Sequence, residues 1–219
     1  SKTAKINKPV KNTAKKANLS AVMNNSFAFG GTNASVIFTK KAKTLNEENT
    51  EIERKAVITG IGITTPFAKN ISELVEKVDG RKKPDSAVIH TEISVEELLS
   101  LGIKMPLYRK MDNLGKMVTV SGINALKDGK YDVNEENSFD TGIIIGTALG
   151  SLGGGCDFQK TLVEKGIKAG SAFKFPNTVY NAAGGHLSIC SGIKGYNATL
   201  TNGSQSGLEC VAVACEEIK

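Results

Sequence analysis

The stretch that most constrains the fold is the apolar run at residues 140–146, Asp-Thr-Gly-Ile-Ile-Ile-Gly. β-Branched residues without polar alternation are typical of a strand buried on both faces, as in a parallel sheet. Further strands are predicted at 55–60, buried and ending in the turn Gly60-Ile-Gly62, and at 195–201. Apolar spacing and capping residues predict helices between them, at 70–79, 95–101, 108–127, 157–167, 178–190 and 205–219. Residues 150–155 are glycine-rich and predict a flexible loop. Strands that alternate with helices predict an α/β fold with a mainly parallel sheet.

Charge is distributed unevenly along the chain. Residues 1–43 contain nine of the 28 basic residues and no Asp or Glu, whereas the remainder carries a net charge of −3. A basic arm can bind nucleic acid or a membrane surface. These lysines are spread out, however, and no aromatic residue precedes Phe27, so bases would have no stacking platform. We therefore expect a flexible, solvated tail at 1–18 and no nucleic-acid partner.

Two β-prone runs, 19–29 and 32–38, flank Gly30-Gly31 and predict a β-hairpin within residues 19–40. Residues 41–54 are polar and charged, and predict a linker. No apolar run approaches the ~20 residues needed to span a bilayer, and no signal peptide is evident. The four cysteines form no CxxC pair and no zinc-site spacing with the histidines. We expect a reduced cytoplasmic protein with no membrane span, no metal and no cofactor.

The candidate for chemistry is a serine on a tight turn between a strand and a helix. Ser204 follows Asn202-Gly203 and precedes the helix predicted at 205–219. Such a turn lifts a side chain out of the sheet and places it at the positive end of a helix, where backbone N–H groups can stabilise an oxyanion. The pattern Gly203-Ser204-Gln205-Ser206-Gly207 differs in register from the G-x-S-x-G elbow of hydrolases. Serine is also a common helix cap, so the turn alone does not establish catalysis.

Five segments, taken together and in order, resemble the β-ketoacyl synthase family of thiolase-fold condensing enzymes. They are Val57-Ile-Thr-Gly-Ile-Gly-Ile-Thr-Thr-Pro66, Tyr108-Arg-Lys-Met-Asp112, Gly142-Ile-Ile-Ile-Gly146, Phe175-Pro-Asn-Thr-Val-Tyr-Asn-Ala-Ala-Gly-Gly-His-Leu-Ser-Ile189 and Gly192–Gly207. The resemblance covers residues 55–219 and implies the first half of a thiolase-like fold. In this alignment Ser204 occupies the position of the family's nucleophilic cysteine.

A sixth segment, Asn25-Ser-Phe-Ala-Phe-Gly-Gly-Thr-Asn-Ala34, resembles a motif that the family carries near its C-terminus. The resemblance implies that the backbone N–H of Phe29 joins the position of Ser204 in an oxyanion hole. It also implies that Phe29 gates the acyl channel and that Gly30, Gly31 and Thr32 bind substrate. Because the motif order is rearranged, the chain is either permuted or spans the junction between the end of one synthase and the start of the next.

The resemblance implies a role in fatty-acid or polyketide chain elongation. The expected partners are an acyl carrier protein bearing acyl or malonyl thioesters, and a ketosynthase subunit in a homodimer or heterodimer that pairs residues 195–201. The family's activating pair, two His or a His and an Asn, would lie in the part of the family's length after residue 219. A serine hydroxyl needs a neighbouring base to act as a nucleophile, and none is identifiable near Ser204 in sequence.

Ser204 therefore has three interpretations: a natural non-condensing subunit like a chain-length factor, an engineered Cys→Ser, or a serine nucleophile with a base from elsewhere. The first is favoured because Asn202, Gly203 and Gln205 also depart from the family pattern. His186 is interpreted as a packing or subunit-contact residue, and His90 has no assigned role. Cys210 and Cys215 are predicted to be buried helix cysteines rather than replacement nucleophiles.

Overall fold

The structure is a computed structural model that describes residues 18–27, 33–40, 56–68, 70–80 and 92–218. The chain forms two compact units. Of the described residues, the first contains 18–26 and 33–40, and the second contains those from residue 56 onward.

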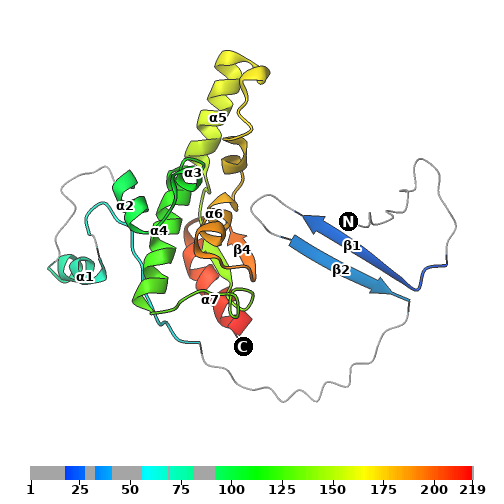
Figure 1. Cartoon of the computed structure of the whole chain (residues 1–219), viewed down its shortest axis with the longest axis horizontal. Coiled ribbons are helices and arrows are strands. Elements are labelled where there is room, and N and C mark those ends of the chain that lie inside the picture. The colour runs from blue at the N-terminus through cyan, green and yellow to red at the C-terminus, as the bar shows by residue number, and fades with distance from the viewer. Residues whose placement is uncertain (1–17, 28–32, 41–55, 69, 81–91, 219) are drawn as a thin grey trace. The chain divides into compact units, whose positions relative to one another are not determined.

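The first unit contains the predicted two-stranded sheet, β1 (Ala21–Phe27) and β2 (Asn33–Thr39). The strands run in opposite directions (Figure 1). Lys40 N–H donates to the Ser20 carbonyl at 3.1 Å, a backbone pair that joins the start of β1 to the end of β2, as expected for antiparallel strands. The Ser35 hydroxyl also donates to Asn25 Oδ1 at 2.8 Å across the two strands. Apolar side chains such as Val22, Ile37 and Phe38 are exposed. A lone hairpin of this kind is marginally stable in water, so it has apolar surface available for further contacts.

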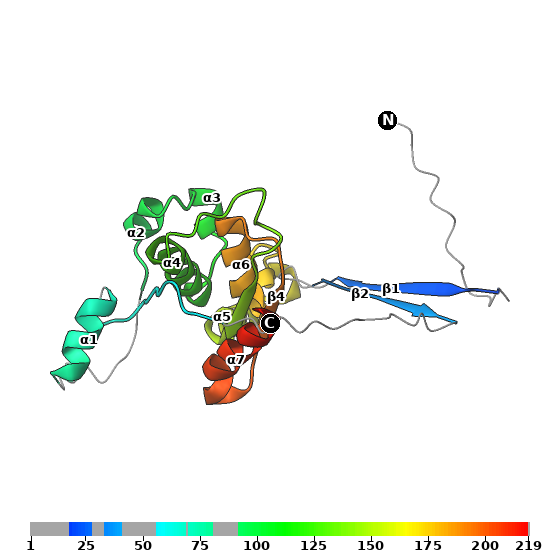
Figure 2. The same cartoon turned by 90° about the horizontal axis from the view of Figure 1, so that it is seen from below.

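The second unit is built on two short parallel strands, β3 (Ile143–Gly146) and β4 (Asn197–Leu200), with Ile143 opposite Asn197 and Gly146 opposite Leu200. Helix α6 (Ala182–Ser191), backed by α4 (Asn113–Asp128), covers one face, and α7 (Ser206–Ile218) covers the other (Figure 2). The remaining elements are α1 (Ile71–Asp79), α2 (Val95–Ser100), α3 (Met105–Tyr108), α5 (Leu152–Lys165) and the 3-10 turns η1 (Ile167–Ala169), η2 (Phe175–Thr178) and η3 (Gly203–Gln205). This is the predicted α/β layering with a parallel strand pair.

Two apolar clusters hold the second unit together. One lies around α2, α3 and α4, and its buried members are Ile93, Leu98, Ile103, Tyr108, Met111 and Val120. The other lies between the sheet and helices α4 and α6, around Ile143, Leu187 and Ile193. Gly122 permits the close approach of α4 and α6, since a Cβ there would lie 2.6 Å from Leu187 Cδ2. The helix pair therefore forms the rigid support on which the sheet lies.

Helix boundaries follow the capping residues closely. Asn70 caps α1 by accepting a hydrogen bond from Glu73 N–H at 2.9 Å. The helix predicted at 108–127 is divided, because Asp112 caps a new helix by accepting from Gly115 N–H at 2.8 Å. The predicted loop at 150–155 is wrong in part. Helix α5 begins at Leu152 and takes Gly153, Gly154 and Gly155 into its first turn, with local helical hydrogen bonding outweighing the unfavourable propensity of glycine.

The predicted buried strand at 55–60 is also wrong in the described structure. Residues 56–60 form no regular element, and Val57 and Ile58 are exposed. The segment that follows is anchored to α4 instead: Ile61 N–H donates to Asp128 Oδ2 at 2.9 Å, and Thr64 Oγ1 lies 2.7 Å from Ser121 Oγ. Periodicity predicted an extended chain here, but a strand also needs a neighbour, and which neighbour is available depends on tertiary packing.

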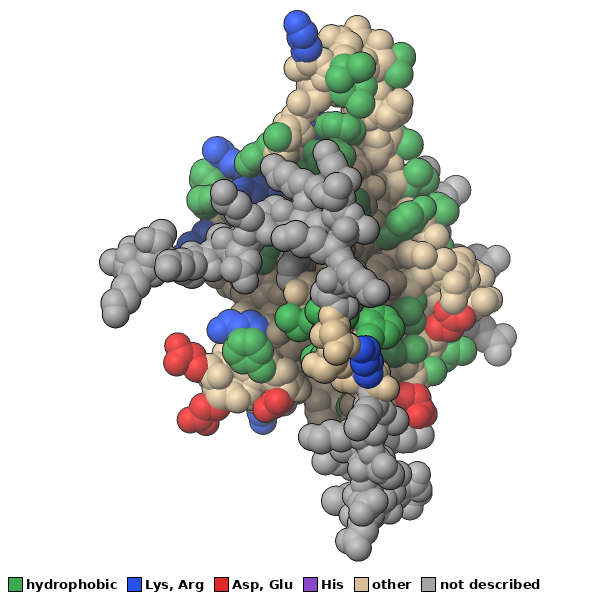
Figure 3. All heavy atoms as spheres, turned by 90° about the vertical axis from the view of Figure 1, so that its right-hand side faces the viewer, with side chains coloured by type: hydrophobic (Ala, Val, Ile, Leu, Met, Phe, Trp, Pro, Cys, Tyr) green, Lys and Arg blue, Asp and Glu red, His purple; other side chains and the backbone are tan. Residues whose placement is uncertain are grey.

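Helix α5 projects from the second unit together with η1 and η2 (Figure 1). Phe158 of α5 and Phe175 of η2 contact each other with ring centroids 5.9 Å apart. Figure 3 shows hydrophobic side chains on the surface of this projection, and Val163, Ile167 and Phe173 are exposed there. Within the described part of the chain, no helix combines the length and apolar character that crossing a membrane requires.

Candidate functional site

Ser204 lies on the turn η3, between the end of β4 and the start of α7. Because β3 and β4 are parallel, their carboxyl ends meet at the edge of the sheet where this turn begins, which is where open α/β sheets commonly bind ligands. Gly203 has φ +71°, in the left-handed region that glycine tolerates and most residues avoid. The Ser204 side chain is exposed. The predicted strand–turn–helix is therefore present, with Ser204 at its apex.

The neighbouring serine holds this turn in place. Ser206 is only 1% exposed. Its hydroxyl accepts a hydrogen bond from Asn202 N–H at 2.7 Å and donates to the Gly203 carbonyl at 2.8 Å. Gly146, at the end of β3, packs directly on the start of α7, since a Cβ there would lie 2.2 Å from the Ser206 carbonyl oxygen. These contacts fix the turn to the end of the sheet, a role for Ser206 that sequence reasoning missed.

A carboxylate lies beside the same turn. The Asn202 side-chain amide donates to Glu209 Oε2 at 2.6 Å, which joins the start of the turn to the first turn of α7. A negative charge near a helix N-terminus is electrostatically favourable. The contact spans seven residues in sequence and has no motif of its own, so only the fold reveals it. Asn202, which differs from the family pattern, thus has a structural role here.

The described residues provide no activating base for Ser204. None of their side chains forms a hydrogen bond with its hydroxyl, and the polar contacts of the turn are made by Asn202, Ser206 and Glu209. A serine hydroxyl without a base is a poor nucleophile at neutral pH, whereas a thiol at a helix N-terminus ionises readily. Among the described residues, the exposed hydroxyl of Ser204 therefore has no neighbouring group that would activate it.

The other predicted members of the site lie outside the described residues. Phe29, Gly30, Gly31 and Thr32 fall in residues 28–32, and His90 falls in residues 81–91. Their expected contribution to an oxyanion hole and substrate site stays a prediction.

His186 has a packing environment, as predicted. It lies in α6, where its Nε2 is 2.7 Å from the side-chain oxygen of Asn177 in η2. The Asn177 amide in turn donates to the carbonyl of Lys110, which lies between α3 and α4. Burial lowers the pKa of His186, while the nearby Asp112 carboxylate opposes that shift. The imidazole therefore joins three segments of the unit as a neutral hydrogen-bonding group.

Cys210 and Cys215 lie within α7 as predicted, but they are only partly buried, and Cys156 in α5 is exposed. The Cys210 thiol lies 3.0 Å from the Gly207 carbonyl. Burial raises the pKa of the Cys190 thiol in α6, which makes it less reactive. Among the residues that the structure covers, no group of three or more His, Cys, Asp or Glu side chains could hold a metal ion.

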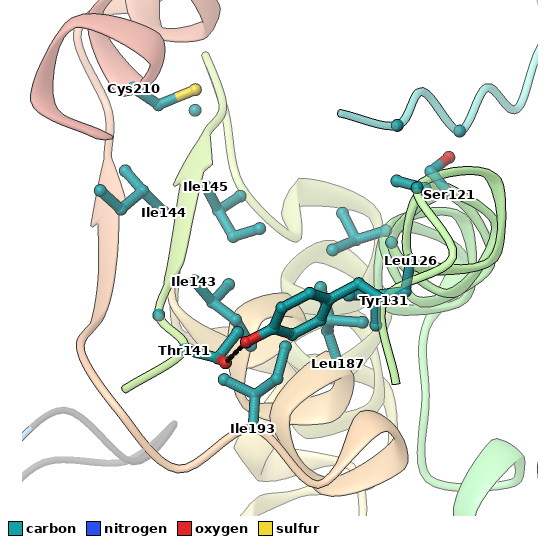
Figure 4. Close-up of a pocket in the computed structure, with 18 of the residues that line it drawn as sticks. Ser121, Leu126, Tyr131, Thr141, Ile143, Ile144, Ile145, Leu187, Ile193 and Cys210 are labelled. Carbon is teal, nitrogen blue, oxygen red and sulfur yellow. Dashed lines mark hydrogen bonds between the residues drawn. The ribbon is translucent and has the colours of Figure 1, made fainter. Parts of the chain in front are cut away.

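A cavity of about 890 Å³ lies beside the sheet, between β3, α4 and the segment that carries Thr59 and Gly60 (Figure 4). Its walls are mainly apolar and include Leu126, Ile143, Ile145, Leu187 and Ile193. Cys210 lines it as well, and a hydrogen bond of 2.9 Å between Tyr131 Oη and Thr141 Oγ1 lies at its border. The predictions from sequence did not identify this cavity.

Comparisons with known proteins agree with this geometry. The 3-oxoacyl-[acyl-carrier-protein] synthase 2 of Vibrio cholerae is 29% identical over 176 residues, which cover 76% of this chain and 42% of that protein. The corresponding synthase of Vibrio harveyi is 34% identical over 110 residues, which cover 50% of this chain and 26% of that protein. The chain thus spans less than half the length of these relatives.

Two solved structures have the same fold. The ishigamide ketosynthase/chain length factor matches with a TM-score of 0.59 and 23% identity, over 73% of this chain and 48% of that one. The AntDE:AntF complex, a type II polyketide synthase acyl-carrier protein with its ketosynthase, matches with a TM-score of 0.60 and 23% identity, over 74% and 47%. The model of the β-ketoacyl synthase N-terminal domain matches residues 88–219, more than half of the chain. The chain belongs to the β-ketoacyl synthase family and has its thiolase-like fold.

Proposed function

We propose that this chain is a subunit or segment of a β-ketoacyl-ACP synthase that serves fatty-acid or polyketide chain elongation and does not condense substrates by itself. The observation that carries the proposal is Ser204, exposed on the nucleophile turn with no activating base among the described residues. A condensing reaction needs an acyl group transferred to the turn, and a hydroxyl in this setting accepts it poorly.

A second function, a chain-length-factor-like partner that shapes the acyl tunnel of an active ketosynthase, has its own support. Apolar side chains are exposed on the helix that follows the turn and just before the outer strand, namely Leu208 and Val211 of α7 and Tyr196 before β4. Exposed apolar side chains that adjoin one another are typical of a subunit interface. One of the structural neighbours is described as a ketosynthase/chain length factor. These observations favour a dimer, either with a second copy or with an active ketosynthase.

The partner that delivers substrate would be an acyl carrier protein, as in the solved complex of such a protein with its ketosynthase. We place the protein in the cytoplasm, consistent with four free cysteines.

We also propose the division of the chain into a basic tail (1–18), a hairpin of the family's C-terminal type (19–40), a linker (41–54) and the N-terminal half of a synthase domain (55–219). The two compact units support a boundary between hairpin and body.

The decisive experiment incubates the full chain with acyl-carrier-protein thioesters and measures the mass of the peptide that contains Ser204. We expect no acyl adduct on the chain that carries Ser204. A covalent acyl group on Ser204 would contradict the proposal, because it would require a base that activates the hydroxyl.

A matched variant, Ser204→Cys, tests whether the turn is built to present a nucleophile. A helix N-terminus lowers the pKa of a thiol. The introduced thiol should therefore be alkylated by iodoacetamide at pH 7 faster than Cys215, which lies inside α7 and serves as the internal control. Equal rates at the two positions would show that the turn does not activate a thiol.

A further inference from the structure

A carboxylate is tethered beside the turn that carries Ser204. Glu209 lies in the first turn of α7 and is half-buried. Its Oε2 accepts a hydrogen bond of 2.6 Å from the side-chain amide of Asn202, the residue that precedes the turn. The Glu209 side chain therefore reaches back past the start of the helix, and its negative charge is held next to the turn instead of extending into solvent.

No positive side chain in this part of the chain offsets that charge. Residues 195–218 contain no Lys, Arg or His, and the next acidic residue of α7 is Glu216, about two helical turns further on. The described elements that pack most closely against α7 are β3, β4 and η3, and their sequences contain no ionisable residue. The other titratable group in this part of α7 is Cys210, whose thiol contacts the Gly207 carbonyl at 3.0 Å. Glu209 thus sets the charge at this end of the helix.

A negative charge at this place opposes the field of the helix. The N-terminus of an α-helix is equivalent to about half a positive charge, which stabilises an anion beside it. A full negative charge held at the same end offsets part of that field and also repels a second anion directly. At position 204 such an anion would be a thiolate, or the oxyanion of an acyl-transfer intermediate. The Glu209 carboxylate disfavours both.

We propose that Glu209, held in place by Asn202, opposes the formation of an anion at position 204. Acyl transfer at this position then meets two barriers, a hydroxyl without a base and a fixed negative charge beside the turn. This role of Glu209 rests on the proposed function, since it concerns the position where the synthase family carries its nucleophilic cysteine. It implies that Ser204→Cys alone gives a thiol less reactive than the turn can support.

The test compares the full chain carrying Ser204→Cys with the double variant Ser204→Cys/Glu209→Gln. Glutamine keeps the length of the side chain and an oxygen that can accept from Asn202, so the charge is removed while the contact is preserved. The rate of iodoacetamide alkylation at position 204 is followed from about pH 6 to 10 by site-resolved mass spectrometry, which gives the pKa of the introduced thiol.

We expect the pKa of this thiol to be lower by about 0.5–1 in the double variant, the effect of one unit charge at about 8 Å in a partly exposed setting. At about pH 7 the thiol should then be alkylated about two- to threefold faster, because a lower pKa gives more thiolate but a less nucleophilic one. Raising the ionic strength from about 0.01 M to 0.5 M should reduce the difference in pKa, since salt screens charges near the surface.

Two further variants separate the charge of Glu209 from the structure of the turn. Ser204→Cys/Glu217→Gln removes the same charge from an exposed residue at the C-terminal end of α7, and should leave the pKa of the introduced thiol unchanged. Ser204→Cys/Asn202→Ala removes the tether of the carboxylate, and should lower that pKa by part of the amount seen with Glu209→Gln. Circular dichroism verifies that each variant is folded.

An equal pKa with and without Glu209→Gln would overturn this role of Glu209. So would an equal decrease in the Glu217→Gln variant, or a difference that salt leaves unchanged. None of these results bears on the proposed function, which is tested by the mass of the peptide that carries Ser204. Conversely, an acyl adduct on Ser204 would contradict the proposed function while the difference in thiol pKa remained, so the two can fail separately.

Discussion

Ser204 and Ser206, at the turn between β4 and α7, should differ sharply in their contribution to stability. Ser206→Ala removes a hydroxyl that is 1% exposed and leaves Asn202 N–H and the Gly203 carbonyl without their partner. Each lost hydrogen bond costs about 1 kcal/mol. Water can reach part of the turn, because Asn202 and Gly203 are exposed residues, so the total is expected at about 1–2 kcal/mol. For a chain of this size, the midpoint of thermal unfolding falls by about 2–8 °C.

Ser204→Ala is the matched control, two residues away in the same turn. Its hydroxyl is exposed and makes no hydrogen bond among the described residues, so the free energy of unfolding should change by less than about 0.5 kcal/mol. Urea unfolding followed by circular dichroism measures both variants, and an unchanged m-value confirms that the same surface unfolds. Equal losses for the two variants, or a larger loss for Ser204→Ala, would refute the assignment of Ser206 as the residue that holds the turn.

Three further predictions address the rest of the second unit. Leu98→Ala in the first apolar cluster should lower the free energy of unfolding by about 2–5 kcal/mol, because Leu98 is fully buried. Leu208→Ala, at a residue that is 77% exposed, should change it little. Similar losses for the two variants in urea unfolding would contradict the burial of Leu98. Gly146→Ala should destabilise by more than about 2 kcal/mol, because its Cβ would overlap the start of α7; a near-native midpoint would show that the strand end can shift. His186 has a pKa below 6.5 in the folded state, so the unfolded chain binds more protons and stability falls as pH drops below about 6.5, levelling off below the folded pKa. His186→Gln should flatten the change in stability between about pH 7.5 and 5.5, and an unaltered slope would remove this histidine as its cause.

The sequence was sufficient to predict the elements whose residues carry their own local signal. Three isoleucines between glycines predicted a buried parallel strand at 140–146, and β3 is found there. The helix predicted at 70–79 is found as α1, and the side chain of Asn70 caps it. The turn at Ser204 could be predicted because a strand, a glycine and a helix follow each other within a few residues, which makes it a local structure.

Only the tertiary structure decided the features that depend on partners distant in the chain. Residues 56–60 have the composition of a strand, yet they lie unpaired because strand formation needs a neighbour and their anchor is on α4. The contact between Asn202 and Glu209, the burial of Ser206 and the cavity beside β3 likewise arise where separate elements meet. Composition and periodicity report how each segment interacts with its own neighbours in sequence. Which surfaces then lie against each other is settled by packing, and in this protein packing sets the support of Ser204 and the cavity beside β3.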